Sequence, residues 1–187
     1  LNLNIALMIT MILSCTLLVV EMIEIKPPTS FVDEISKENI FTIFLAGSIE
    51  MGKAINWQDK VVESLKDEKD LVILNPRRDN WDSSWKQTID NPNFVEQVDW
   101  ELEGIGDADL VVFYFDPETI SPITLMELGT CKNKKAVVCC PDGYFRKGNV
   151  DIFCKKYGIH QEHDLASLIH YIKISKRWFP LLKGIYT

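Results

Sequence analysis

The sequence has no run of lysine or arginine longer than the pair Arg77-Arg78, and its formal net charge is −7. Proteins that bind a phosphate backbone concentrate basic side chains on one face. The composition therefore argues against nucleic acid as a partner.

Motifs for metals and common cofactors are also missing. The five cysteines show no C-x-x-C spacing, and His160 and His163 stand three residues apart without the further ligands of a metal site. G-x-G-x-x-G, G-x-x-x-x-G-K-[ST] and G-x-S-x-G do not occur. We therefore expect no metal and no cofactor, and we expect reduced, buried thiols in a cytoplasmic protein.

Charged residues are absent from residues 1–20, and the apolar run at residues 5–20 is nearly long enough to cross a bilayer. This run lacks a basic n-region and a small-residue cleavage site, so it does not match a secretory signal. Three interpretations remain open: a short membrane anchor, a buried or frayed tail, or translated sequence upstream of a start at Met22. Pro27 and Pro28 oppose helix and strand, which predicts a linker at residues 21–39.

The length of 187 residues and the apolar content of 47% favour a single domain. We place it at residues 40–175, between an N-terminal segment at 1–39 and a C-terminal tail at 176–187.

Within that domain, compact apolar runs alternate with amphipathic segments. The runs predict strands at residues 41–46, 71–74, 110–114 and 136–140, with a further short strand near Ile159. The amphipathic segments predict helices at residues 57–66, 94–106, 124–133, 150–157 and 164–174. This alternation predicts an α/β fold with a doubly wound parallel sheet of about five strands and right-handed crossovers.

Glu127 falls in the helix that follows the strand at residues 110–114. We expect Ser121 to cap this helix with its side chain and Pro122 to suit its first turn. The adjacent residues Met126 and Leu128 are apolar, so we expect Glu127 to be partly desolvated. Such a carboxylate can attack an electrophilic carbon, as in retaining glycosidases. The alternative is an ordinary glutamate on a solvated helix face.

A retaining glycosyl transfer also needs a proton donor. The helix at residues 94–106 offers Asp99 and Glu101, each about 80° from the centre of its apolar stripe, on opposite flanks. Periodicity does not choose between these two acids. Trp100 points further outward, as does Glu103. The stripe is formed by Val95, Val98, Leu102 and Ile105.

Six motifs in this order resemble those of the nucleoside 2-deoxyribosyltransferase family, over about residues 41–174. They are Phe44-Leu45-Ala46-Gly47-Ser48-Ile49, Asn75-Pro76-Arg77-Arg78, Gln97-Val98-Asp99-Trp100-Glu101, Ala108-Asp109, Ser121-Pro122 with Met126-Glu127-Leu128-Gly129, and Arg146-Lys147-Gly148-Asn149-Val150. The resemblance implies a flavodoxin-like sheet and exchange of the base of a 2-deoxyribonucleoside through a covalent sugar ester. It implies that Glu127 is the nucleophile and that Glu101, where the family usually has aspartate, is the proton donor, with Asp99 as the alternative.

The resemblance also implies a set of substrate-binding residues. Gly47 and Ser48 follow the first strand, where a glycine can let a ligand approach the backbone. Phe44 or Ile43 stands at a tyrosine position of the family. The remaining residues implied to bind substrate are Asn80 and Trp81 near the base, Ser121 near the sugar, and Asn149.

Asn149 matches a residue that the family lends to a neighbouring subunit near the sugar 5′ hydroxyl, which implies a homo-oligomer. The implied partners are small molecules, a 2-deoxyribonucleoside and a free nucleobase. Ser121 also resembles the serine of the related 2′-deoxynucleoside 5′-monophosphate N-hydrolases, and Ser48 and Ser121 permit a phosphate. A hydrolase therefore remains an alternative function, as does a catalytically silent nucleotide-binding module.

Overall fold

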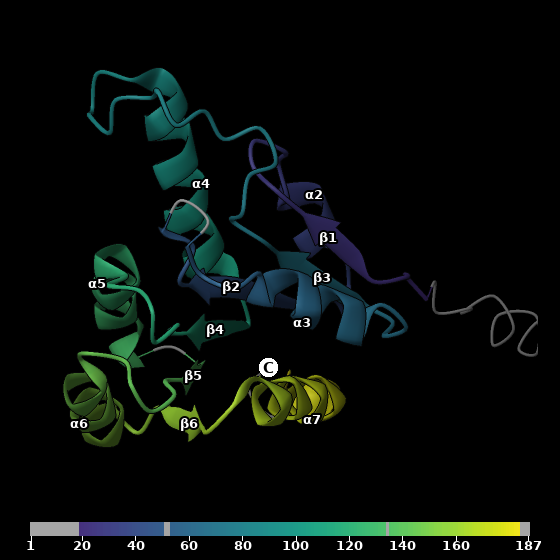
Figure 1. Cartoon of the computed structure of the whole chain (residues 1–187). Coiled ribbons are helices and arrows are strands. Elements are labelled where there is room, and N and C mark those ends of the chain that lie inside the picture. Colours follow the sequence, from purple (N-terminus) through teal and green to yellow (C-terminus); the bar gives the residue numbers. More distant parts are fainter. Residues whose placement is uncertain (1–18, 51–52, 134, 184–187) are drawn as a thin grey trace, which may run out of the picture.

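The computed structural model describes residues 19–50, 53–133 and 135–183, which form one parallel sheet between two layers of helices (Figure 1). The six strands of this sheet are β1 (Ile23–Ile25), β2 (Phe41–Gly47), β3 (Leu71–Leu74), β4 (Leu110–Tyr114), β5 (Ala136–Cys139) and β6 (His160–Glu162). The helices are α2 (Val32–Ile35), α3 (Trp57–Leu65), α4 (Pro92–Asp107), α5 (Pro122–Thr130), the short 3-10 helix η2 (Cys131–Asn133), α6 (Lys147–Tyr157) and α7 (Leu165–Lys183).

The strand order is β1-β3-β2-β4-β5-β6, and every neighbouring pair is parallel. Counted from β2, the order is 2-1-3-4-5, which is the flavodoxin-like arrangement. The predicted doubly wound sheet is confirmed, and β1 adds a sixth strand at its edge.

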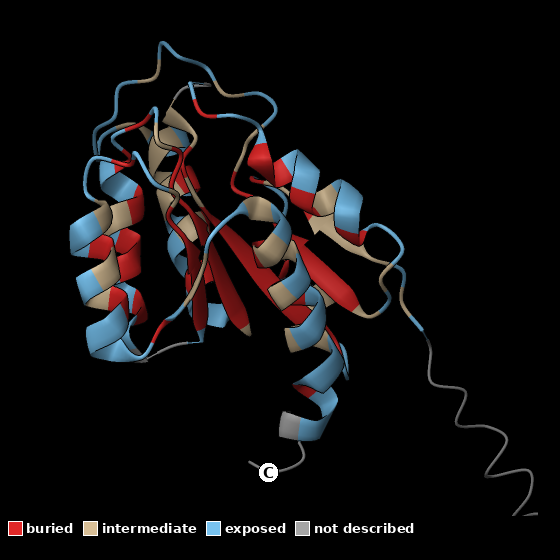
Figure 2. Cartoon of the chain, turned by 60° about the horizontal axis from the view of Figure 1, so that its bottom comes forward, coloured by how far each residue is buried: buried red, intermediate tan, exposed pale blue. Residues whose placement is uncertain are grey.

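Two hydrophobic clusters lie on opposite faces of this sheet. Helices α4, α5 and α6 cover one face, through residues such as Trp100, Leu128 and Val150. Helices α3 and α7 cover the other, through Trp57 and Leu168. The four inner strands β2, β3, β4 and β5 are buried almost throughout (Figure 2), which explains why they read as continuous apolar runs instead of alternating ones.

The predicted linker at residues 21–39 is wrong. Residues Ile23 to Ile25 pair with Val72 to Leu74 of β3, and Phe31 is buried against Trp100 with ring centroids 5.4 Å apart. Pro27 and Pro28 come after the last paired residue, so they end a short edge strand and do not prevent it.

The predicted C-terminal tail begins inside α7, which continues to Lys183 instead of ending near Ile174. Phe179 explains the extension, because its ring packs on Phe41 at 4.9 Å and is buried. The interpretations of residues 1–18 lie outside the described residues. Within the described ranges, no helix is long and apolar enough to span a membrane.

Helix α4 is rotated relative to the predicted stripe. Its buried residues are Gln97, Trp100, Gly104 and Ile105, whereas Leu102 is 48% exposed. The predicted outward position of Trp100 is therefore wrong, since its indole N–H donates to the backbone oxygen of Thr29 at 2.9 Å. The close contact that fixes the rotation is Gly104 on Phe44, where a Cβ would lie 2.7 Å from the ring Cδ2.

We expect Gly104→Ala to lower the free energy of unfolding by about 1–3 kcal/mol, because the fully buried Phe44 ring has no room to move away from the added methyl group. Urea unfolding would measure this change. Gly106→Ala in the same helix is the control, since a Cβ there meets no atom within 4 Å outside its own helical turns. Better helix propensity should stabilise that variant by up to about 1 kcal/mol. Equal effects of the two substitutions would contradict the packing argument.

Candidate active site

The winding of the sheet reverses between β2 and β4. The chain leaves β2 through α3 on one face, and it leaves β4 through α5 on the other. In open α/β sheets a crevice forms at the carboxyl ends of the two strands where this reversal occurs, and ligands bind there. The candidate site therefore lies beyond Gly47 and Tyr114, which are register partners.

Three hydroxyl groups from the two loops at this edge form a buried cluster. Ser48 Oγ accepts from the backbone N–H of Asp116 at 2.9 Å and lies 2.6 Å from Ser121 Oγ. Thr119 Oγ1 lies 2.9 Å from Ser48 Oγ and 2.8 Å from Ser121 Oγ. These contacts join the β2–α3 loop to the β4–α5 loop and leave Ser48 with no exposed surface.

The predicted side-chain cap by Ser121 is wrong. Its hydroxyl is held in the cluster and makes no capping hydrogen bond to α5. Its backbone adopts a left-handed conformation, with φ at 46° and ψ at 55°, which residues other than glycine rarely adopt. Such strain persists only where surrounding contacts hold it, and it is common at functional sites.

Glu127 lies in α5 and is 7% exposed. Burial raises its pKa from the ordinary 4.5 to about 8, and the negative charge of Glu101 adds to the rise. The expected desolvation of this carboxylate is confirmed, and the alternative of a solvated helix face is wrong. The two carboxyl groups, one from α4 and one from α5, therefore interact electrostatically.

Glu101 is the acid of α4 that faces Glu127. Burial raises its pKa to about 7, against the opposing effect of a hydrogen bond from Gln97 Nε2 to Glu101 Oε1 at 2.8 Å. Asp99 is exposed to solvent on the other flank of the helix. The rotation of α4 about Gly104 thus settles an orientation that helical periodicity left open.

Two carboxyl groups with raised pKa values that repel each other share protons near neutral pH. Because ionisation of one group opposes ionisation of the other, the pair holds one proton over a range of pH near neutrality, and attack by Glu127 requires the form in which this proton is on Glu101. A carboxylate nucleophile beside a carboxylic acid is the combination that retaining glycosyl transfer requires.

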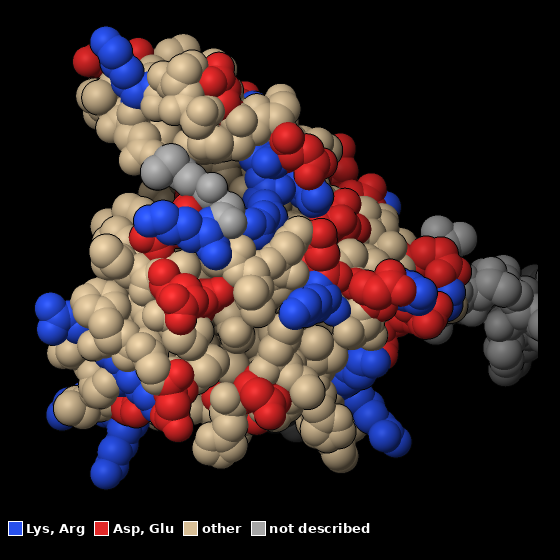
Figure 3. Space-filling model, viewed as in Figure 1, with Lys and Arg blue, Asp and Glu red and all other residues tan. Residues whose placement is uncertain are grey.

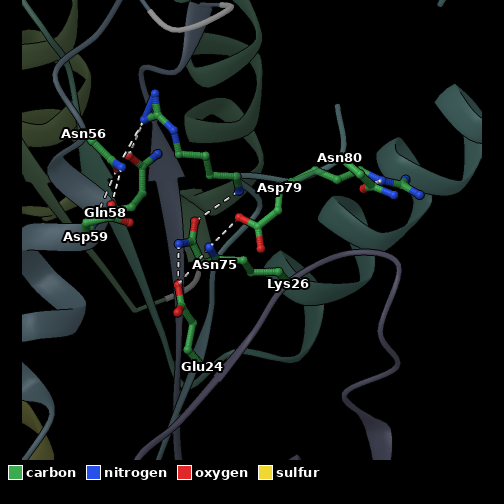
Figure 4. A network of polar contacts seen from close by, with 10 residues as sticks. Glu24, Lys26, Asn56, Gln58, Asp59, Asn75, Asp79 and Asn80 are labelled. Carbon is green, nitrogen blue, oxygen red and sulfur yellow. Dashed lines mark hydrogen bonds and ion pairs between the residues drawn. The ribbon is translucent and has the colours of Figure 1, made fainter. Parts of the chain in front are cut away.

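Polar contacts hold the loop that follows β3 at the same edge (Figure 4). Asn75 Nδ2 donates to Glu24 Oε1 at 2.6 Å, and Lys26 Nζ donates to Asp79 Oδ1 at 2.8 Å, which ties the loop to the edge strand β1. Arg77 Nη1 donates to Asn56 Oδ1 at 3.2 Å, which ties it to the start of α3.

Asn80 and Trp81 belong to this loop. The exposed Asn80 accepts from Arg78 Nε at 2.9 Å, and the half-buried Trp81 packs on Trp85 with ring centroids 5.3 Å apart. Arg78 also lies over the Trp85 ring. In Figure 3 the loop and the start of α4 project above the body of the molecule, with Lys and Arg side chains gathered at the base of the projection.

Three residues expected to bind substrate lie in the core, in a tight backbone contact or on the exposed surface of a helix. Phe44 is fully buried against Trp100 and Gly104, so it belongs to the core. Gly47 is required by packing, because a Cβ there would lie 2.5 Å from the Tyr114 backbone oxygen. Asn149 is exposed and lies in the first turn of α6.

Comparison with known proteins places these residues in a family. The model of a family described as nucleoside 2-deoxyribosyltransferase like matches residues 40–144. The chain belongs to this nucleoside 2-deoxyribosyltransferase-like family. The matched range contains Glu101 and Glu127 and ends before Asn149.

A solved structure supports the fold of this nucleoside 2-deoxyribosyltransferase-like protein. A conserved protein from Enterococcus faecalis V583 is similar to it with a TM-score of 0.52 at 17% identity, over 72% of this chain and 98% of that one. No curated protein matches the chain. At this identity the likeness concerns the fold alone.

Sequence reasoning missed Gln97 as a residue of the site, although it belongs to a motif that resembles the family. The available signal was its spacing, since residues four apart on a helix share a face. Gln97 is one turn before Glu101 and contacts it directly.

We expect Glu127→Gln to raise the melting temperature increasingly as the pH rises from about 5 to about 8. The native state retains a proton on Glu127 that the unfolded chain, with a pKa near 4.5, gives up. The native state therefore binds more protons between these values, and the free energy of unfolding of the parent falls as the pH rises. Glutamine does not ionise and escapes this loss.

Melting curves at closely spaced pH values would measure this effect. Asp99→Asn is the control, because Asp99 is exposed, and its melting temperature should follow that of the parent at every pH. A difference between Glu127→Gln and the parent that does not change with pH would contradict the assigned environment.

Proposed function

We propose that the protein is a nucleoside 2-deoxyribosyltransferase, which exchanges the base of a 2-deoxyribonucleoside through an ester of the sugar with Glu127. The observation that carries this proposal is the pair formed by the buried Glu127 and the half-buried Glu101, on two helices that cover the same face of the sheet at the edge where its winding reverses. Membership of the nucleoside 2-deoxyribosyltransferase-like family supports it.

In the first step, an ionised Glu127 oxygen attacks C1′ of the deoxyribose while the bond from C1′ to the base nitrogen breaks. The departing base keeps the bonding electrons and takes a proton from Glu101. A second base then attacks C1′ and returns its proton to Glu101, which releases Glu127 as a carboxylate. Water in place of the second base would give hydrolysis.

The buried hydroxyl cluster supports a nucleoside over a 5′-monophosphate as substrate. Ser48 Oγ contacts Ser121, Thr119 and the Asp116 amide. Its capacity for hydrogen bonds is used within the protein, so a phosphate would have to break this cluster to reach it.

Exchange of isotope-labelled bases tests the proposal. The protein is incubated with 2′-deoxyadenosine and labelled adenine, and with 2′-deoxyinosine and labelled hypoxanthine, and the products are resolved by mass spectrometry. Labelled nucleoside indicates a transferase, whereas free deoxyribose indicates a hydrolase. Parallel incubations with the 5′-monophosphates test the other substrate class. Absence of any product would contradict the proposal and favour a binding module.

Three carboxylate substitutions should separate the roles of the acids. We expect Glu127→Ala to lower exchange by several orders of magnitude, because no ester forms. Glu101→Gln should slow exchange by about 10²–10⁴-fold, since the base leaves without a proton. Asp99→Asn, two residues away and exposed, is the matched control and should exchange at the parent rate. Impairment of Asp99→Asn with a normal Glu101→Gln would reverse the assignment.

We also propose that Asn149 completes the site of a second copy of this chain. Asn149 and Ile152 are three residues apart on α6 and share a face, and Ile152 is 72% exposed. The outer side of α5 likewise exposes Ile123 and Met126. Exposed apolar side chains on two adjacent helices are typical of a protein interface.

Mixing Glu127→Ala chains with Asn149→Ala chains tests this arrangement. We expect exchange activity to reappear, because a symmetric mixed dimer has one site with both defects and one site with neither. Each variant incubated alone is the control, and mass spectrometry of the intact dimer verifies subunit exchange. If verified mixed dimers remain as inactive as the separate variants, Asn149 does not act in a partner's site.

A further inference from the structure

The side chain of Gln97 makes hydrogen bonds with only one of its two polar atoms. It is 4% exposed, and its Nε2 donates to the backbone oxygen of Pro76 at 2.9 Å and to Glu101 Oε1 at 2.8 Å. Its Oε1 is buried and has no hydrogen-bond partner within the part of the chain that the structure describes. Buried acceptors are nearly always satisfied, so this oxygen calls for an explanation.

The amide of Gln97 is held in one orientation. The carbonyl oxygen of Pro76 only accepts hydrogen bonds, so the nitrogen of the amide must face it. An exchange of Nε2 and Oε1 would place two oxygens in contact. The unpartnered atom is therefore fixed as an acceptor, and it lies on the side chain that contacts the proton donor of the proposed reaction.

We propose that Gln97 Oε1 accepts a hydrogen bond from the exocyclic amino group of the base, so that the enzyme prefers amino bases such as adenine and cytosine to their oxo counterparts. This inference rests on the proposed function and names its class of base. The carboxylic acid of Glu101 and the acceptor Gln97 Oε1 complement the edge of a nucleobase on which a ring nitrogen lies beside an amino group.

Adenine has such an edge, with N7 beside the 6-amino group, and amide side chains read this edge in DNA. Glu101 donates its proton to the ring nitrogen, and Gln97 Oε1 accepts from the amino group. Hypoxanthine presents an oxygen in place of the amino group, so two acceptors would face each other. The Pro76 contact prevents the amide from turning to relieve this clash.

A different role for Gln97 would be to hold Glu101 in place without contacting the base. In that case its substitution would slow exchange of every base by the same factor. Selectivity between two bases therefore separates the two roles.

The test compares kcat/KM for exchange of 2′-deoxyadenosine and 2′-deoxyinosine in the parent and in Gln97→Met. We expect the parent to prefer 2′-deoxyadenosine by at least about tenfold, because a site built to accept an N–H rejects the analogue that lacks it. In Gln97→Met this ratio should fall close to one. Both substrates are measured on the same preparation, so any unfolded fraction of the variant cancels in the ratio.

Gln161→Met is the matched control. Gln161 Nε2 also donates to a carboxylate, Asp151 Oδ1 at 2.8 Å, but it lies in β6 at the far edge of the sheet. The selectivity ratio of this variant should equal that of the parent. A parent that exchanges both nucleosides equally, or a Gln97→Met variant that keeps the parent ratio, would overturn the inference.

Calorimetric binding of free adenine and free hypoxanthine separates this inference from the proposed function. If no nucleoside is exchanged, the proposed function fails. Tighter binding of adenine by the parent, lost in Gln97→Met, would still support the role of Gln97. Equal affinity for the two bases in the parent would overturn it.

Discussion

The parallel pairing of β2 with β4 is the contact on which the rest of the structure depends. These central strands are almost completely buried, and their register sets Gly47 opposite Tyr114. The next residue, Ser48, donates its N–H to the Tyr114 backbone oxygen at 2.9 Å, so the pairing continues into the loops. Because the two strands feed helices on opposite faces, their carboxyl ends form the edge at which α5 begins and which α4 approaches.

That edge contains both the hydroxyl cluster that joins the two loops and the start of the helix that positions Glu127. The hydroxyl cluster of Ser48, Thr119 and Ser121 joins the two loops and holds Ser121 in a left-handed conformation. Helix α5 starts from this fixed point, and Glu127 follows on its buried side. The backbone strain at Ser121 and the desolvation of Glu127 both oppose folding. They are tolerated here because burial of the inner strands of the sheet stabilises the folded state.

The approach of α4 to the sheet decides which acid joins Glu127. Gly104 lets the helix contact the ring of Phe44, and Trp100 and Gln97 follow onto the same side. Glu101 is carried inward with them, whereas Asp99 remains in solvent. The contact of Gly104 with Phe44 therefore determines which acid of α4 is turned inward and has a raised pKa, although neither residue contributes a polar group to the candidate site.

The sequence by itself determined the order of strands and helices from β2 onward and the parallel sheet, because long apolar runs and their spacing express local and strongly repeated preferences. It left Glu127 either partly desolvated or on a solvated helix face, and only the tertiary structure decided that this residue is buried. The sequence also pointed to the family through its ordered motifs. Only the tertiary structure decided between Asp99 and Glu101, recruited residues 23–25 as an edge strand, turned Ser121 from a cap into part of a hydroxyl cluster and brought Gln97 to Glu101. Each of these outcomes depends on contacts between residues distant in the chain, such as Gly104 on Phe44 and Ser48 on Ser121, and packing at that range leaves no periodic trace in the sequence.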